Sequence, residues 1–278
     1  MMNIQNILVP IDFSDCSKNA LKYAIYLAKK FQAKIHMVNA VHVHSAHPDV
    51  VGGSIVAAVI KDYEDMVRES FEKLEKEIIE LQDVPHSADQ FLAYLIDAIH
   101  TECETKDIDF IVMGTKAEHD ELEKVLGSRT TDVIDTATVP ILVVPEGWEK
   151  AGIEIIAFAC QMEEVKNPMR VKMLNQFALD FGAKIEAFTV AKRREDITAA
   201  DQNIFKNLIH SFDEGIASFS TIEASSTIEG ITSFCNSHHP DLLTLIPKEH
   251  TFFERLFKKS ISKSIALHVP VPALFFRE

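Results

Sequence analysis

The chain has 278 residues, which is more than one typical domain holds and fits two domains of roughly 140 residues each. Its hydrophobic fraction of 47% and charged fraction of 25% are typical of globular proteins and exclude disordered or collagen-like chains. The formal net charge of −14 predicts an acidic surface that repels nucleic acid phosphates and anionic lipid heads. We therefore expect no nucleic acid partner and no membrane partner.

The sequence carries no pattern typical of membrane insertion or secretion. No apolar run approaches the ~18 residues that span a bilayer, and residues 1–5 lack a basic segment followed by an apolar core. The four cysteines follow no C-x-x-C spacing, which favours reduced, core-filling thiols over a disulfide frame or a zinc site. We expect a cytoplasmic protein.

Strands and helices alternate along the first half. The apolar run Ile7–Asp12 predicts a buried strand, Ser14 can cap a helix that reaches Phe31, and Ala33–Ala40 predicts a second strand. The later predicted elements are a long helix over about residues 55–82, a weaker helix at Tyr94–Glu104, and strands at Asp109–Met113 and Val139–Val144. This order is typical of an α/β domain with a doubly wound, mostly parallel sheet.

The second half repeats the first. Ile153–Ala159 predicts a strand, Pro168 begins a helix that Gly182 ends, and Ala183–Val190 resembles Ala33–Ala40 at an offset of 150. Farther along, an ungapped offset of 132 superimposes identical residues: Ile96 on Ile228, Ile99 on Ile231, Cys103 on Cys235, Asp109 on Asp241, Ser128 on Ser260, Val139 on Val271, Pro140 on Pro272 and Leu142 on Leu274. The second copy therefore lacks about 18 residues around the long helix. The sequence predicts two domains in tandem, residues 1–147 and residues 148–278, with the boundary in the polar stretch Glu146–Glu149.

Two glycine-containing turns in the first copy indicate a ligand site. Their residues are Met113, Gly114, Ala117, Gly127, Ser128, Arg129 and Thr130. Beyond the carboxyl ends of parallel strands, helix amino termini present unpaired N–H groups to phosphate. Gly114 and Gly127 let the backbone approach a ligand, and nearby hydroxyls can donate to phosphate oxygens. Asp12, which ends the first strand, is placed to accept a hydrogen bond from a ribose hydroxyl.

This arrangement resembles the universal stress protein family, whose nucleotide-binding members carry G-x2-G-x9-G-[ST] after the fourth strand and an aspartate after the first. The first copy has G-x2-A-x9-G-S in the corresponding place and V-P-I-D at Val9–Asp12, and the resemblance covers nearly the whole chain, twice. It implies two Rossmann-like, adenine nucleotide alpha hydrolase-like domains. It also implies that Pro10, Ile11 and Asp12 flank adenine and ribose. The phosphates of ATP would be surrounded by Gly114, Ala117, Gly127, Ser128, Arg129 and Thr130.

The first copy departs from the motif at one glycine, which is Ala117. If that backbone position has a positive φ, the methyl group costs about 1 kcal/mol, roughly a fivefold loss of affinity. The acidic residues between the turns add repulsion that magnesium, or the lysines beside them, would offset: Glu118, Asp120, Glu121 and Glu123. The alternative interpretation is that Gly114 and Gly127 only shape loops.

The second copy keeps little of the motif, so we expect no nucleotide there. We align Cys160 with Asp12, and the remaining replacements are Ile246 and Pro247 for Gly114 and Thr115, Glu249 for Ala117, and Lys259 for Gly127. Only Ser260 is retained. A basic group forms around Arg255 (Lys258, Lys259 and Lys263) and is interpreted as a solvated helix face or a contact for an anionic partner.

No pattern predicts catalytic residues or a metal site. Three histidines follow the second strand, namely His42, His44 and His47, but no cysteine or acidic ligand has a fixed spacing to them. The sequence has no G-x-S-x-G, no P-loop and no G-x-G-x-x-G motif. Enzyme activity is left undecided, and slow ATP hydrolysis or phosphotransfer would depend on the hydroxyls of Ser128 and Thr130.

Two functions from different classes therefore compete. The first is a stress-response or signalling module that holds ATP or a related adenine nucleotide, with magnesium, in the first domain with little or no turnover. The second is a nucleotide-independent interaction or assembly protein. In either case the apolar terminal strands Val139–Val144 and Val271–Phe276 would be open edges unless paired, and the family resemblance implies that they pair the copies into a pseudo-dimer. Association of whole chains through exposed sheet edges stays open.

Overall fold

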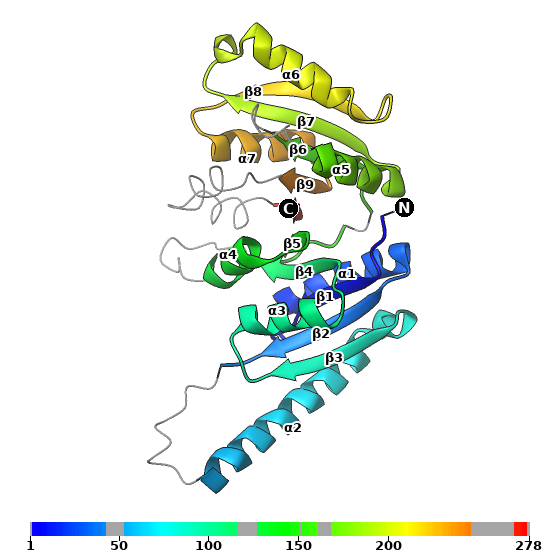
Figure 1. Ribbon diagram of the computed structural model, residues 1–278, viewed down its shortest axis with the longest axis vertical. Helices are drawn as coiled ribbons and strands as arrows, with labels where there is room; N and C mark the ends of the chain where they lie inside the picture. Colours follow the sequence, from blue (N-terminus) through cyan, green and yellow to red (C-terminus); the bar gives the residue numbers. More distant parts are fainter. Residues whose placement is uncertain are drawn as a thin grey trace. The chain divides into compact units, whose positions relative to one another are not determined.

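The structure is a computed structural model that describes residues 2–42, 53–115, 127–150, 152–160, 168–245 and 270–276. The chain divides into two compact units, Ile4–Met113 and Gly114–Glu278 together with Met1–Asn3. Both units are mixed α/β, and their strands are mostly parallel (Figure 1). The fold class predicted from the alternation of strands and helices is therefore confirmed. Among the helices it describes, none combines the length and the hydropathy needed to cross a bilayer.

The Ile4–Met113 unit contains the predicted elements in the predicted order and, in addition, a 3-10 turn and a strand at His86–Phe91 that were not predicted from the sequence. In chain order, the elements are β1 (Asn6–Pro10), α1 (Asp15–Phe31), β2 (Lys34–Ala40), α2 (Gly53–Glu77), a 3-10 turn (Ile79–Asp83), β3 (His86–Phe91), α3 (Leu95–Thr105) and β4 (Phe110–Thr115), whose last two residues belong to the other unit. The strand order is β3-β2-β1-β4, and all three pairings are parallel.

The order of strands reverses between β1 and β4. The chain runs from β1 through β2 to β3 on one side, and returns through α3 to β4 on the other. Because such crossovers are right-handed, α1 and α2 cover one face of these strands and α3 covers the opposite face. Ligands of open α/β sheets bind beyond the carboxyl ends of the strands at such a reversal. The fold therefore directs attention to the residues that follow β1.

Helix α1 begins and ends through specific backbone contacts. Ser14 is its N-cap, and its side chain accepts a hydrogen bond from the N–H of Ser17. Apolar residues recur at helical spacing and are buried, from Ala20 to Phe31. The helix ends at Gln32, which adopts the left-handed conformation with φ 58°. Helix α1 is therefore bounded by the Ser14 cap and by the left-handed Gln32, and it directly follows the turn after β1.

The Gly114–Glu278 unit contains the rest of the chain. Its described elements are α4 (Gly127–Thr136), β5 (Ile141–Pro145), β6 (Ile155–Ala159), α5 (Pro168–Phe181), β7 (Lys184–Ala191), a 3-10 turn (Arg194–Asp196), α6 (Ala199–Ile209), β8 (Ala217–Glu223), α7 (Thr227–His238), β9 (Leu242–Leu245) and β10 (Ala273–Phe275). Parallel pairings join β8, β7, β6, β9 and β10 in that order, and β10 also pairs with β5 in the antiparallel sense.

The duplication predicted from the sequence recurs in the way β1 and β6 are anchored. Asp109 Oδ2 accepts hydrogen bonds from the backbone N–H groups of Gln5 (2.8 Å) and Asn6 (2.9 Å). Asp241 Oδ2 accepts the equivalent bonds from Glu154 (2.8 Å) and Ile155 (2.9 Å). Each aspartate therefore satisfies two backbone donors at the start of the first strand of its repeat.

The two terminal strands pair with each other, as expected for open apolar edges. Val143 of β5 lies opposite Ala273 of β10, and Ile141 lies opposite Phe275. This pairing places β5 in the same compact unit as the second repeat, so the contact-based division at Met113 differs from the predicted boundary at residue 147. That boundary stays a prediction about the sequence repeat.

Candidate functional site

Asp12 is the exposed carboxylate that follows β1. Its Oδ1 accepts hydrogen bonds from the Ser14 N–H (3.1 Å) and the Ser14 hydroxyl (2.5 Å), which close a tight turn into α1. Burial raises the pKa of Asp12, but hydrogen bonds from Ser14 and Ser17 outweigh this effect, so the pKa lies below its ordinary value. The carboxylate is therefore ionised at neutral pH and faces solvent, as a group that accepts a ligand hydroxyl should.

The backbone below Asp12 is held by a buried amide. Ile11 is 3% exposed, and its N–H donates to the Val38 carbonyl at 2.8 Å. Asn39, at 5% exposure, donates from Nδ2 to the Ile11 carbonyl at 2.7 Å. Tyr63 of α2 in turn donates its hydroxyl proton to Asn39 Oδ1 at 2.7 Å. Both the N–H and the carbonyl of Ile11 therefore form hydrogen bonds. The Asn39 amide that binds the carbonyl is itself held by Tyr63 of α2.

Phe13 has an unusual backbone conformation next to Asp12. Its φ is 64°, in the left-handed region that bulky L-residues rarely adopt. Its ring packs edge-on against Phe71 of α2, with ring centroids 5.0 Å apart. The turn that orients Asp12 is therefore held in a costly conformation by an aromatic contact.

The other predicted site residues are placed as follows. Pro10 is the buried last residue of β1, and Met113, 5% exposed, lies in β4. Gly114 continues β4, and Thr130, 7% exposed, lies in α4. Gly127 is the first residue of α4, and Ser128 and Arg129 follow it, but the side chains of Ser128 and Arg129 lie outside the described structure. Ala117 and the acidic residues between the turns also lie outside the described residues.

The structure corrects the alignment of Cys160 with the first repeat. The Cys160 N–H donates to the Phe188 carbonyl at 2.9 Å, just as the Ile11 N–H donates to Val38, and Phe188 aligns with Val38 at the offset of 150. Cys160 is therefore the counterpart of Ile11, not of Asp12. The alignment was wrong by one residue because the register is set by backbone pairing with the neighbouring strand, which side-chain similarity does not report. The counterpart of Asp12 is then Gln161, outside the described residues.

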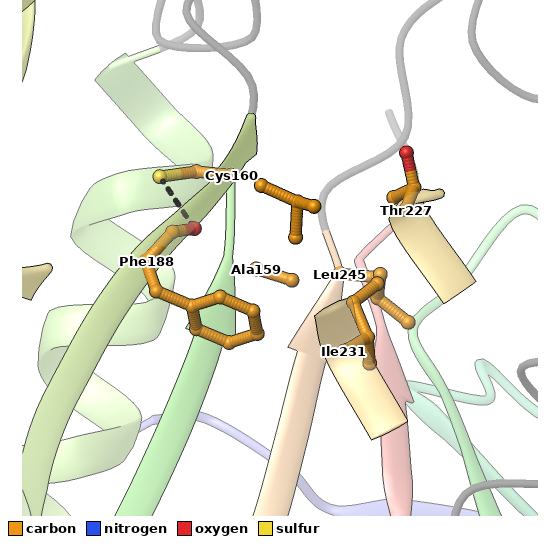
Figure 2. A pocket seen from close by; sticks show the side chains of 7 residues that line it. Ala159, Cys160, Phe188, Thr227, Ile231 and Leu245 are labelled. Atoms are coloured by element: carbon orange, nitrogen blue, oxygen red, sulfur yellow. Dashed lines mark hydrogen bonds between the residues drawn. The ribbon is translucent and has the colours of Figure 1, made fainter. Parts of the chain in front are cut away.

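A small apolar cavity lies at the corresponding end of the second repeat (Figure 2). Its volume is about 20 Å³, enough for roughly one water molecule and far too small for a nucleotide. It is lined by residues at the carboxyl ends of the strands and at the start of α7: Ala159, Cys160, Phe188, Val190, Thr227, Ile231 and Leu245. The Cys160 thiol points away to donate to the Phe188 carbonyl at 3.5 Å. This end of the second repeat is filled by side chains where the described residues define it.

The histidines and cysteines considered for metal and thiol chemistry are placed as follows. Within the described ranges, no group of three or more His, Cys, Asp or Glu side chains could hold a metal ion. His42 stacks on Tyr94 with ring centroids 3.9 Å apart, and His44 and His47 lie outside these ranges. None of the four cysteines, all of them described residues, forms a disulfide, and burial raises the pKa of Cys235 to about 12. Of the four, Cys103 is only half-buried.

Asn39 and Tyr63 belong to this region but were not identified from the sequence. The available signal was a polar Asn near the end of an apolar strand, since such a group must find a partner when buried. Nothing in the sequence indicates that the partner would be a tyrosine 24 positions later.

Comparison with known proteins supports the family resemblance and the fold. Residues 3–145 match the model of the Universal stress protein family. A universal stress protein A homolog from Coxiella burnetii is 29% identical over 150 residues, covering 54% of this chain and 99% of the relative. Universal stress protein MJ0531 from Methanocaldococcus jannaschii is 30% identical over 142 residues, covering 50% and 81%. A solved universal stress protein from Archaeoglobus fulgidus has the same fold over 98% of this chain and 96% of that chain, with a TM-score of 0.72 at 16% identity. The chain belongs to the universal stress protein family.

Proposed function

We propose that the first repeat binds ATP or a related adenine nucleotide with little or no turnover, as a stress-response or signalling module of the cytoplasm. The observation that carries this proposal is the ionised, exposed Asp12 at the end of β1, beside the point where the strand order reverses. A fixed carboxylate at that place is suited to accept hydrogen bonds from the vicinal hydroxyls of a ribose.

The chemistry of the remaining residues supports binding rather than reaction. In the proposal, Pro10, Ile11 and Met113 lie beside adenine, since all three are apolar residues near the ends of β1 and β4. The phosphate side would depend on Gly114 and on the helix that begins at Gly127, with Mg²⁺ offsetting the charge of the nucleotide. The side chains that donate hydrogen bonds to Asp12 are the hydroxyls of Ser14 and Ser17, which are not general bases for hydrolysis at neutral pH.

Calorimetric titration of the full chain with ATP and Mg²⁺ tests the proposal. We expect one site per chain, because the second repeat has Ile246 and Lys259 where the first has Gly114 and Gly127. Asp12→Ala should weaken the affinity about tenfold, the effect of losing a charged hydrogen-bond acceptor. Asp15→Ala is the matched control, because Asp15 is also exposed and lies three residues away in the first turn of α1.

Each outcome of the titration has a definite meaning. Equal affinity for the wild type and Asp12→Ala would remove Asp12 from the site. Two equivalent sites per chain would contradict the assignment of binding to one repeat. If no adenine nucleotide binds, the nucleotide-independent interaction protein becomes the better function, with association through sheet edges as its mode of action.

A further inference from the structure

Helix α2 contacts the turn that carries Asp12 at two separate places. Tyr63 reaches the Ile11 carbonyl through the side chain of Asn39, with both hydrogen bonds at 2.7 Å. Two helical turns later, Phe71 packs on Phe13. Residues 11 and 13 flank Asp12, so the helix holds the chain on both sides of the carboxylate.

The first contact is a buried relay with matched donors and acceptors. Asn39 is 5% exposed, and its amide group uses one donor on the backbone and one acceptor on the Tyr63 hydroxyl. Without that hydroxyl, Asn39 Oδ1 would lose its partner inside the protein, and the amide would gain freedom to rotate away from the Ile11 carbonyl.

The second contact stabilises a conformation that the backbone itself disfavours. Phe13 has a φ of 64°, and a phenylalanine left to its intrinsic preference returns to negative φ. Such a change would rotate the Asp12–Phe13 peptide and move the carboxylate away from the Ser14 N–H that now donates to it at 3.1 Å. The Phe71 ring, which is 6% exposed, prevents this relaxation by packing.

The second repeat lacks the residues of the first contact. Thr189 stands at the position of Asn39 at the offset of 150, and all four tyrosines of the chain precede residue 95. The corresponding helix α6 has 11 residues, whereas α2 has 25, so the segment that carries Tyr63 has no counterpart. The relay is therefore present in the repeat that keeps the motif and absent from the repeat that lost it.

We propose that Tyr63 and Phe71 are positioning residues that hold the Asp12 carboxylate in place for the ligand hydroxyl, so that α2 is part of the binding site without touching the ligand. This proposal rests on the proposed nucleotide binding, because the nucleotide supplies the hydroxyl that the Asp12 carboxylate would accept. Its geometric content, that α2 sets the orientation of Asp12, is separate and can be tested without ligand.

The first experiment measures the pKa of the Asp12 carboxyl by NMR in the ligand-free full chain. Tyr63→Phe and Phe71→Leu should each raise this pKa toward the ordinary value of 3.8, because the hydrogen bonds from Ser14 lengthen when the turn relaxes. Phe205→Leu, which truncates a buried phenylalanine of α6 that stacks on Phe219, is the matched control and should leave the pKa unchanged. An unchanged Asp12 pKa in both α2 variants would overturn the proposal.

The second experiment measures ATP affinity by calorimetry. Tyr63→Phe and Phe71→Leu should weaken binding about threefold to tenfold in the wild-type background and should have no effect when added to Asp12→Ala. Equal losses in both backgrounds would show that α2 does not act through Asp12 and would overturn the proposal. If the wild type binds no ATP, the proposed function fails, and the NMR experiment alone then decides whether α2 positions Asp12.

Discussion

At the residue scale, Asp241 is a buried carboxylate that joins Lys150 to the start of β6. Its side chain is 1% exposed, pairs with Lys150, and accepts two backbone N–H groups at the start of β6. Burial raises the pKa of Asp241, but these hydrogen bonds outweigh the effect, so the pKa in the folded protein lies below 3.8. The folded state therefore favours the ionised form more than the unfolded chain does.

This shift predicts how the contribution of Asp241 to stability depends on pH. The contribution is complete above the unfolded value of 3.8 and is lost as the pH falls through the lower folded value. Asp241→Asn should lower the free energy of unfolding by about 1–3 kcal/mol at pH 7, and the difference from the wild type should shrink below pH 4 or so. Urea unfolding at pH 7 and at acidic pH measures both quantities.

The repeat offers a matched control for this prediction. Asp109 accepts the equivalent pair of backbone N–H groups but is only half-buried. Asp109→Asn should therefore destabilise less than Asp241→Asn, because water can replace part of what is lost. An equal loss of unfolding free energy in both variants would mean that burial and the Lys150 ion pair add little to the stability that Asp241 contributes.

At the scale of elements, the first helix of each repeat ends in the same way with different residues. Gln32 follows α1 with φ 58°, and its counterpart Gly182 follows α5 with φ 67°. Glycine adopts this conformation without a Cβ penalty, whereas glutamine does not. The second repeat therefore ends its helix at lower conformational cost.

The difference predicts that substitutions at the two positions change the free energy of unfolding in opposite directions. Gln32→Gly should raise the free energy of unfolding by about 0.5–1 kcal/mol, and Gly182→Ala should lower it by about 1 kcal/mol even though no atom lies within 4 Å of the added methyl group. Denaturant titration of the two variants measures both changes. A loss of stability in Gln32→Gly would show that the glutamine side chain makes a contact worth more than the backbone penalty.

The elements that the sequence predicted and those it missed differ in burial. β1 and β4 are continuous apolar runs with buried interiors, and such runs are recognisable without a structure. β3 (HSADQF) and β8 (ASFSTIE) lie at the ends of the strand order, are mostly half-exposed, and carry polar residues that resemble loops. Helix α2 was predicted to extend to about residue 82, but it ends at Glu77 and a 3-10 turn follows.

In the candidate site, too, local patterns could be predicted from the sequence, whereas contacts between distant residues could not. The exposed position of Asp12 could be predicted because it depends on a local pattern, a polar residue directly after a buried strand. The relay from Tyr63 to Asn39 could not, because it depends on how α2 packs against β2, and residues distant in sequence give no local signal of their pairing. The misplacement of Cys160 by one position has the same origin, since strand register is a property of two strands.

At the scale of the whole molecule, β5 is stabilised by a strand from the far end of the chain. Ile141, Leu142 and Val143 pair with Phe275, Leu274 and Ala273. All six residues are buried, at 2% exposure or less. Removing the second repeat would expose this apolar edge, which is a template for pairing with another chain.

A truncated chain tests the importance of this pairing. Residues 1–147 alone should form a homodimer or aggregate, because β5 would seek a new partner. In the full chain the partner strand is tethered, at an effective concentration in the millimolar range, so pairing within the chain is favoured. Sedimentation velocity distinguishes the outcomes, and a monodisperse monomer of residues 1–147 would show that β5 needs no partner.

The same pairing imposes an order of events on the ribosome. Val143 and Ala273 are 130 positions apart, and translation adds roughly 5–20 residues each second, so about ten seconds pass between the synthesis of β5 and that of β10. During this interval the nascent first repeat can fold, but its β5 edge has no partner from its own chain. Neighbouring ribosomes on one message carry identical nascent chains with the same open edge. Slower elongation through the second repeat would therefore increase pairing between nascent chains, whereas rapid completion of the chain favours closure within it.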